Sequence, residues 1–256
     1  MAVLGAAAAS AYPQIFITES KTWVPPQDGN ICIHLVGAGG GGVGTSQGTY
    51  GGGGGGYCKK NSLAVTTAGS FTIVVGSGGA GSWSNNDAAD GGDTTVAGTG
   101  LSSTLTANGG DGGDGSGGGN HGGAGGAASN GDVNMTGATA GSGGGCVNVY
   151  TSGRSSGVTD AAGGGLACSG WGEICGGTEQ DRGQWDNTYV GHPIYSGDLC
   201  GGAYGYGSAN ASVSYIMGAH GGIGGGGGGA RQTSYNTYAG GGNGGDGLVI
   251  IQYLPW

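Results

Sequence analysis

The sequence predicts a mainly irregular fold with few β-strands: polyglycine-II helices, a polyproline-II-type conformation, pack into a sandwich closed by a small β clasp and carrying distal loops. Three observations lead to this prediction. Glycine provides 73 of the 256 residues and is gathered in runs. Larger residues recur at every third position within those runs, and strand-like segments lie at both ends of the glycine-rich region.

The run over residues 109–127 shows the three-residue spacing clearly. A polyproline-II-type helix turns once in three residues and rises about 3.1 Å per residue. Residues with this spacing lie on one stripe of the helix, and the glycines between them form the other faces. Asp111 and Asp114 share one stripe in this run, and His121 and Ala124 share another. We expect the stripes to face outward and the glycine faces to contact one another.

Lateral packing of these helices satisfies backbone groups that an isolated helix leaves unbonded. A lone polyproline-II helix has no internal hydrogen bonds, whereas neighbours without Cβ atoms approach closely enough for N–H groups to bond the next segment's C=O groups. Such bonds are needed because glycine loses more backbone entropy on ordering than any other residue. We assign these helices to residues 37–44, 51–56, 76–81, 109–126, 141–145, 163–165, 218–229 and 240–247.

The alternative is a flexible glycine-rich linker or low-complexity tail. Disordered chains are typically highly charged and poor in aromatic residues. Here only 8% of the residues are charged, and the chain has 5 Trp, 12 Tyr and 2 Phe. The aromatic residues lie between the glycine runs, where the ends of packed helices need cover. These features favour an ordered structure.

Alternating residues predict a β-strand over residues 31–36, and residues 70–75 and 248–253 are two further strand candidates. The first two lead directly into glycine runs, and the third follows the last glycine run. Residues 15–18 and 21–26 are expected to form a short extended initial segment. Because strands adjoin the glycine region at both ends, we expect them to form a small β clasp at its base.

Insertions of unequal length connect the glycine runs, and the longest covers residues 166–217. Loops longer than about 15 residues in a compact domain are usually functional or disordered, and the aromatic content of this one argues against disorder. The sequence divides into an N-terminal attachment segment, residues 1–30, and a glycine-rich sandwich with inserted loops, residues 31–256. The remaining insertions are 45–50, 57–75, 82–108, 127–140, 146–162 and 230–239.

Composition excludes several classes of partner. The net charge is −9 with 6 Lys and Arg in total, so no basic stripe exists to neutralise phosphates. We therefore expect no binding to nucleic acid. Membrane insertion is not expected either, because no apolar run approaches the roughly 20 residues that span a bilayer. The N-terminus lacks the basic segment of a secretory signal, so we expect synthesis without Sec export.

The 6 cysteines are expected to be free thiols that act as small buried apolar residues. A disulfide among Cys168, Cys175 and Cys200 after release from the cell is the alternative.

Motifs for catalysis or cofactor binding find little support. A P-loop is excluded because no lysine follows a glycine, and GxGxxG matches are uninformative in so glycine-rich a chain. A calcium-binding repeat is matched only once, over residues 241–249, whereas such sites need tandem copies. The 4 histidines lack zinc-ligand spacing. We predict no catalytic residues, no cofactor and no metal site.

The aromatic residues of the longest insertion and of residues 230–239 are the predicted binding site. Tyr and Trp offer large, stiff contact areas with a polar group at low entropic cost, which is why binding loops concentrate them. The alternative is that these rings cover the apolar rim of the sandwich. The predicted receptor-binding residues are Trp171, Trp185, Tyr189, Tyr195, Tyr204, Tyr206, Tyr235 and Tyr238.

The chain resembles the glycine-rich tip adhesins of T-even-like bacteriophage long tail fibres and, more broadly, glycine-rich phage virion proteins. The matching features are the short apolar start MAVLG, the segment TWVP at residues 22–25, the strand at 31–36 opening into GAGGGG, and the segment GGDGLVIIQY at residues 244–253. The chain differs from the tip adhesins in having only about 30 residues before the glycine runs.

The resemblance implies a virion protein made in the host cytoplasm, whose distal loops bind a host cell-surface protein or glycan. The absence of catalytic motifs predicts that it is not an enzyme. It also implies attachment to other virion or tail-fibre proteins through residues 1–30. A homotrimeric fibre component is one arrangement that fits the short N-terminal segment. The alternative function is a structural fibre or decoration protein whose loops mediate self-assembly.

Overall fold

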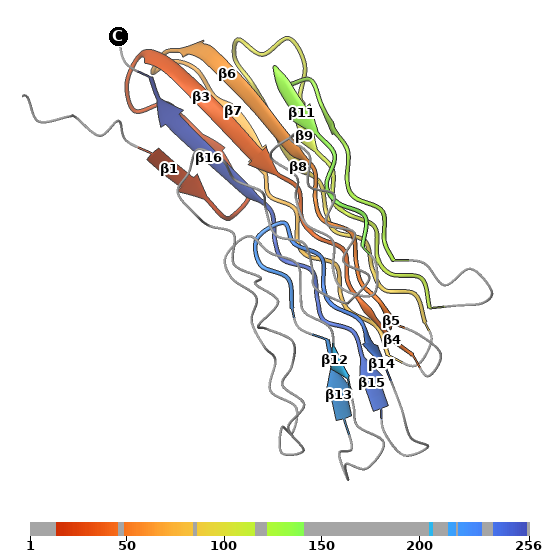
Figure 1. Ribbon diagram of the computed structural model, residues 1–256. Coiled ribbons are helices and arrows are strands. Elements are labelled where there is room, and N and C mark those ends of the chain that lie inside the picture. Colours follow the sequence, from red (N-terminus) through yellow and green to blue (C-terminus); the bar gives the residue numbers. More distant parts are fainter. Residues whose placement is uncertain are drawn as a thin grey trace, which may run out of the picture.

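The computed structural model describes residues 14–45, 49–83, 86–115, 122–140, 205–206, 215–218, 220–231 and 238–254. These residues are all-β, with no helix among them. Two five-stranded sheets lie at one end of the molecule, small sheets lie at the other, and glycine-rich stretches run between them (Figure 1). We call these the sheet end and the distal end.

The first sheet holds two of the predicted strands. The predictions for residues 31–36 and 248–253 are confirmed, and these strands pair antiparallel from Val36 opposite Leu248 to Ile31 opposite Tyr253. All neighbours in this sheet are antiparallel. Its order is β1 (Gln14–Ile17), β16 (Leu248–Tyr253), β3 (Gly29–Val36), β6 (Tyr57–Val65) and β11 (Val133–Met135).

The second sheet is also antiparallel throughout. It confirms the predicted strand at 70–75, and the expected initial segment supplies one strand to each sheet. The attachment role of residues 1–30 stays a prediction. The order of the second sheet is β10 (Ala128–Ser129), β9 (Leu105–Ala107), β8 (Thr94–Gly98), β7 (Phe71–Val74) and β2 (Lys21–Trp23).

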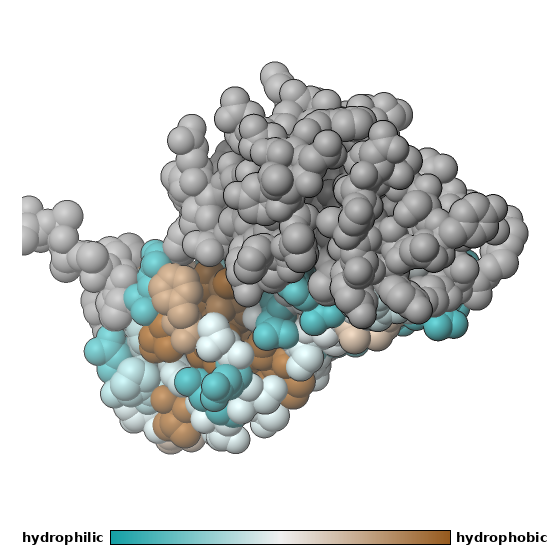
Figure 2. All heavy atoms as spheres, turned by 90° about the horizontal axis from the view of Figure 1, so that it is seen from below, coloured by the Kyte–Doolittle hydropathy of each residue, from teal (hydrophilic) through white to brown (hydrophobic). Residues whose placement is uncertain are grey.

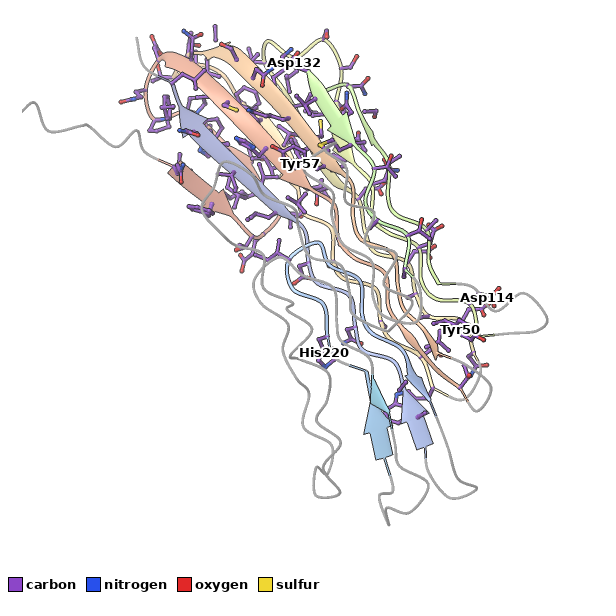
Figure 3. The ribbon with its side chains drawn as sticks, viewed as in Figure 1. Tyr50, Tyr57, Asp114, Asp132 and His220 are labelled. Atoms are coloured by element: carbon purple, nitrogen blue, oxygen red, sulfur yellow. The ribbon has the colours of Figure 1, made fainter. Side chains whose placement is uncertain are left out.

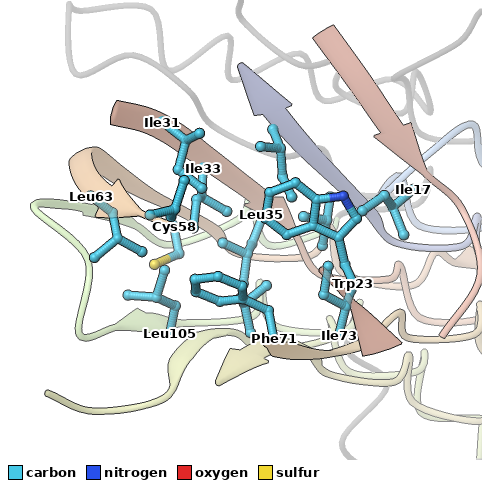
Figure 4. Close-up of a cluster of buried hydrophobic side chains, with 14 of the residues drawn as sticks. Ile17, Trp23, Ile31, Ile33, Leu35, Cys58, Leu63, Phe71, Ile73 and Leu105 are labelled. Carbon is cyan, nitrogen blue, oxygen red and sulfur yellow. The ribbon is translucent and has the colours of Figure 1, made fainter. Parts of the chain in front are cut away.

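The hydrophobic core lies between these two sheets (Figure 4). Alternate residues of β3 meet alternate residues of β7, β8 and β9, as expected for two sheets that pack face to face. The rings of Trp23 and Phe71 are 5.5 Å apart between centroids. Burying each large apolar side chain contributes about 1.5–3 kcal/mol relative to exposure. The largest fully buried side chains include Phe71, Ile17, Ile31, Ile33, Leu35, Ile73 and Leu105.

The glycine stretches are joined laterally by backbone hydrogen bonds. Successive N–H groups of residues 37–42 donate in rotation to three neighbouring stretches. Gly37 and Gly40 donate to residues 51–56. Ala38 and Gly41 donate to residues 86–93, and Gly39 and Gly42 donate to residues 240–247. The donor–acceptor distances are 2.8–3.1 Å. These bonds satisfy buried backbone groups that no sheet ladder satisfies.

The close approach of these stretches requires glycine. A Cβ atom on Gly40 would lie 2.1 Å from the carbonyl oxygen of Asp111, and one on Gly53 would lie 1.9 Å from that of Ala124. Both distances are far below van der Waals contact between heavy atoms. Any side chain at these positions would force neighbouring stretches apart.

Aspartates complete the hydrogen bonding along one edge of the glycine stretches. Their Oδ1 atoms accept from glycine N–H groups at 2.7–3.0 Å. The aspartates are three residues apart on one segment, and their glycine partners are three residues apart on the other. The two segments run antiparallel. The pairs are Asp93 with Gly109, Asp90 with Gly112 and Asp87 with Gly115.

The predicted fold class was wrong. We expected a mainly irregular fold, a sandwich of polyglycine-II helices with a small β clasp, whereas the described residues are all-β with two antiparallel sheets and show no such helix sandwich. The physical reason is that residues 57–75 and 82–108, which we treated as insertions with one strand at 70–75, also hold β6, β8 and β9. Their apolar side chains complete both sheets and bury the core between them. The predicted helices at 141–145 and 163–165 lie outside the described residues.

Candidate binding site at the distal end

The distal end is built from short strands that follow or precede glycine stretches. One sheet has the order β12, β14, β4 and β5, and a second pairs β13 with β15 (Figure 1). The connections 46–48, 207–214 and 232–237 each join two of these strands. The strands are β4 (Val43–Thr45), β5 (Thr49–Tyr50), β12 (Gly205–Tyr206), β13 (Tyr215–Met217), β14 (Ala230–Arg231) and β15 (Tyr238–Gly240).

Two of the predicted receptor-binding residues have a described backbone, and both lie at the distal end. Tyr206 belongs to β12 and is in register with Arg231 of β14. Tyr238 belongs to β15 and is in register with Tyr215 of β13. The other predicted residues lie outside the described residues, namely Trp171, Trp185, Tyr189, Tyr195, Tyr204 and Tyr235.

The distal end holds two further aromatic residues that the sequence reasoning did not select. Tyr50 ends β5 (Figure 3), and a Cβ atom on Gly113 would lie 2.7 Å from the carbonyl oxygen of Tyr50. Trp83 forms an isolated antiparallel bridge with Gly240, at the end of β15, and is 38% exposed. Both aromatic residues adjoin a glycine run, and that position in the sequence is the signal that would have found them.

Trp83 is the one large exposed hydrophobic side chain at the distal end among the described residues. The remaining four belong to or adjoin strands of the sheet end: Phe16, Val24, Val74 and Val133. Figure 2 shows the molecule from below, with brown hydrophobic areas gathered on one part of the described surface among white and teal ones.

Trp83 stands at the end of a seam, by which we mean the contact between residues 76–83 and residues 240–247. Along this seam Asn243 Oδ1 accepts from the N–H of Gly81 at 2.9 Å, and Asp246 Oδ1 accepts from the N–H of Gly78 at 2.7 Å. The two side chains are three residues apart and exposed. They therefore point to the same side of the segment and edge the seam with polar groups.

A shallow hollow of about 530 Å³, largely open to solvent, lies beside the seam. Its described lining is Gly78, residues 220–223 and residues 243–246. His220 borders it and accepts at Nδ1 from the N–H of Asn243 at 2.9 Å. The walls are mainly glycine backbone, with imidazole, amide and carboxylate groups at the margin. Such a hollow offers hydrogen-bonding groups together with some apolar surface, to which Ile223 contributes.

A second cluster of reactive groups lies at the sheet end and is buried. His34 Nδ1 is 2.7 Å from Tyr57 Oη, and His34 Nε2 is 3.3 Å from Cys32 Sγ. Burial, aided by Lys59, lowers the pKa of His34 to about 4, and burial raises the pKa of the Cys32 thiol. At neutral pH the imidazole is therefore neutral and the thiol protonated, so this pair lacks the activated thiolate of a cysteine nucleophile.

The cysteine prediction holds where it is described. Cys32 and Cys58 are buried free thiols, and burial raises the pKa of Cys58 to about 11. The remaining four cysteines lie outside the described residues. Within the described ranges, no three His, Cys, Asp or Glu side chains are grouped so that they could hold a metal ion.

Comparison with protein families gives one match, to the family described as a glycine-rich domain, over residues 17–254. The chain belongs to this glycine-rich domain family. The match confirms the glycine-rich part of the resemblance, whereas its tail-fibre part stays a prediction. A search of curated proteins gives no match for this glycine-rich domain. In the part of the domain that the structure describes, no helix has the length and apolarity needed to cross a membrane.

Proposed function

We propose that this glycine-rich domain is a receptor-binding adhesin of a bacteriophage virion, which presents its distal end to a molecule on the host cell surface. The observation that carries the proposal is the lateral hydrogen bonding of the glycine stretches. These bonds join the glycine stretches side by side, and the stretches so joined carry the distal strands at their ends. A rigid scaffold of this kind suits the presentation of a binding surface.

Preorganisation is the physical reason why such a scaffold suits adhesion. When a partner binds, the side chains and loops of the binding surface lose conformational entropy. A surface that is already ordered loses less, so it binds more tightly. The connections 46–48, 207–214 and 232–237 each join two distal strands. Backbone hydrogen bonds pair these strands with their neighbours. The connections are thus attached at positions set by the scaffold.

The sheet end supports the proposed attachment to other virion proteins. β1 is an edge strand of the first sheet, and its Phe16 side chain is 58% exposed. Unpaired strand edges and exposed apolar side chains are common at contacts between protein chains. Attachment there leaves the distal end turned away from the particle, toward the host.

Cell binding by the purified protein tests the proposal. Wild-type protein is compared with the triple variant Trp171→Ala, Trp185→Ala and Tyr189→Ala on a panel of bacterial strains by flow cytometry. We expect the wild type to bind some strains and the triple variant to lose most of that binding. Val74→Thr, at an exposed position of the sheet end, is the matched control and should bind like the wild type.

The assay separates adhesion from the alternative role in self-assembly. Analytical ultracentrifugation of the same proteins reports whether the triple substitution changes the oligomeric state. Failure of the wild type to bind any strain, with oligomers that dissociate in the triple variant, would favour a structural fibre protein. Unchanged cell binding by the triple variant would remove these aromatic residues from the receptor site.

A further inference from the structure

The seam brings one aromatic ring and a row of polar side chains to the same edge of the molecule. Trp83 lies against Gly240, and Asn243 and Asp246 follow at intervals of three residues. Three residues of extended chain span at most about 10 Å. The ring and the polar groups therefore form a continuous strip that a small extended ligand can cover.

The indole of Trp83 lies face-on against the backbone of Gly240. A Cβ atom on Gly240 would lie 2.7–2.8 Å from three consecutive atoms of the six-membered ring, Cδ2, Cε2 and Cζ2. Only a position over the ring face is equally far from three such atoms. With one face supported by glycine backbone and 38% of the residue exposed, the indole is a flat, fixed platform.

The polar groups beside the platform retain hydrogen-bonding capacity. Asn243 and Asp246 each use one oxygen in the bonds to the neighbouring segment. The amide nitrogen of Asn243 and the second carboxylate oxygen of Asp246 are left to act as a donor and an acceptor. Both residues are exposed and border the hollow, which places a donor and an acceptor within one site.

We propose that the seam binds a neutral oligosaccharide, with one pyranose ring stacked on Trp83 and the hydroxyl groups of the adjoining sugar bonded to Asn243 and Asp246. The C–H groups on a pyranose face are weakly positive and match the negative face of an indole. Sugar hydroxyls both donate and accept, as the amide and carboxylate require. This inference rests on the proposed function, because it names the chemistry of the receptor.

Other ligand classes fit the seam less well. A protein partner needs about 800 Å² of each surface with an apolar centre, whereas Trp83 is a single ring bordered by glycine backbone. Phosphate-rich or acidic polymers are repelled by a chain with a net charge of −9. A neutral saccharide needs neither a broad apolar patch nor basic side chains.

An array of bacterial surface polysaccharides tests the inference directly. Fluorescently labelled wild type, Trp83→Phe, Trp83→Leu and the control Val74→Thr are applied to the array, and equilibrium binding is measured. Leucine keeps apolar cover over Gly240 but has no aromatic face, whereas phenylalanine keeps both. We expect the wild type and the control to bind the same neutral polysaccharide equally. Trp83→Leu should bind at least about tenfold more weakly, and Trp83→Phe should lie between them.

Two results on the array would overturn the inference: no polysaccharide bound by the wild type, or equal binding by Trp83→Leu and Trp83→Phe. Cell binding in parallel separates this failure from failure of the proposed function. Binding to cells that survives periodate oxidation of surface sugars but is lost after protease treatment would keep the adhesin and exclude the saccharide. Ring-dependent binding on the array without binding to any cell would keep the saccharide site and exclude the adhesin.

Discussion

Replacing Gly40 by alanine tests whether the glycine stretches depend on direct backbone contact. Gly40 donates to the carbonyl of Gly53 at 2.9 Å and accepts from the N–H of Gly227 at 2.9 Å. The new Cβ atom would lie 2.1 Å from the carbonyl oxygen of Asp111. The stretches must separate by about 1 Å to restore van der Waals contact, and that shift weakens both hydrogen bonds.

The expected loss of stability combines two contributions. Overpacking a closely packed site costs about 1–3 kcal/mol, and each weakened hydrogen bond costs about 1 kcal/mol. Alanine offsets about 0.4–1 kcal/mol by restricting the unfolded chain. We therefore expect Gly40→Ala to lower the free energy of unfolding by about 3 kcal/mol, which lowers Tm by about 10 °C in a chain of this size.

Urea and thermal unfolding, followed by circular dichroism, measure this loss, and hydrogen exchange of residues 37–42 reports it locally. Gly69→Ala is the matched control, because a Cβ atom there would meet its nearest neighbour, the carbonyl oxygen of Thr66, at 3.1 Å. The control should change the free energy of unfolding by less than about 1 kcal/mol. Equal unfolding midpoints for the two variants would refute the close packing of the stretches.

Three further predictions concern side chains. Asp90→Ala removes the acceptor that lies 2.7 Å from the N–H of Gly112 and should cost about 1 kcal/mol in urea unfolding, whereas Asp90→Asn keeps an oxygen there and should cost less. The pKa of His34 is lowered from 6.5 to about 4, so the unfolded chain binds more protons between these pH values. Stability is full above pH 6.5 and falls by about 3 kcal/mol toward pH 4; unfolding of His34→Gln across this range should lack that slope. Because burial raises the pKa values of Cys32 and Cys58, both thiols should react with iodoacetamide at least about tenfold more slowly in native protein than in urea, as peptide mapping will show.

The longer strands were predictable from local apolar patterns. Apolar residues recur at every second position in residues 31–36, and residues 248–253 are apolar except for Gln252; both segments flank the glycine region and are strands of the first sheet. The second sheet was harder to foresee. β8 and β9 are short, and Val96 and Leu105 are their only large apolar residues, so each strand alone gives a weak signal. Their burial depends on partners that lie far away in the sequence.

Side-chain patterns also could not reveal how the glycine stretches end. The sequence pattern did not single out Trp83, although it contacts Gly240 across the seam. The contact depends on the register between two segments more than 150 residues apart, and glycine carries no side chain that specifies register. The aspartates at 87, 90 and 93 show the same limit, because their spacing is evident but their glycine partners are not.

The sheet end must set most of the register of the glycine stretches. Glycine-rich segments specify register weakly, because only a few side chains, such as Asp90 and Asp246, bond across to the neighbouring stretch. In the first sheet, however, Val36 lies opposite both Leu248 and Tyr57. These pairs fix where the stretches at 37–42, 51–56 and 240–247 begin or end. A register slip would move Ile33 and Leu35 from the core to the other face of the sheet, at a cost of about 1.5–3 kcal/mol per side chain. The hydrophobic core thus determines which backbone groups meet at the distal end, including the contact of Trp83 with Gly240.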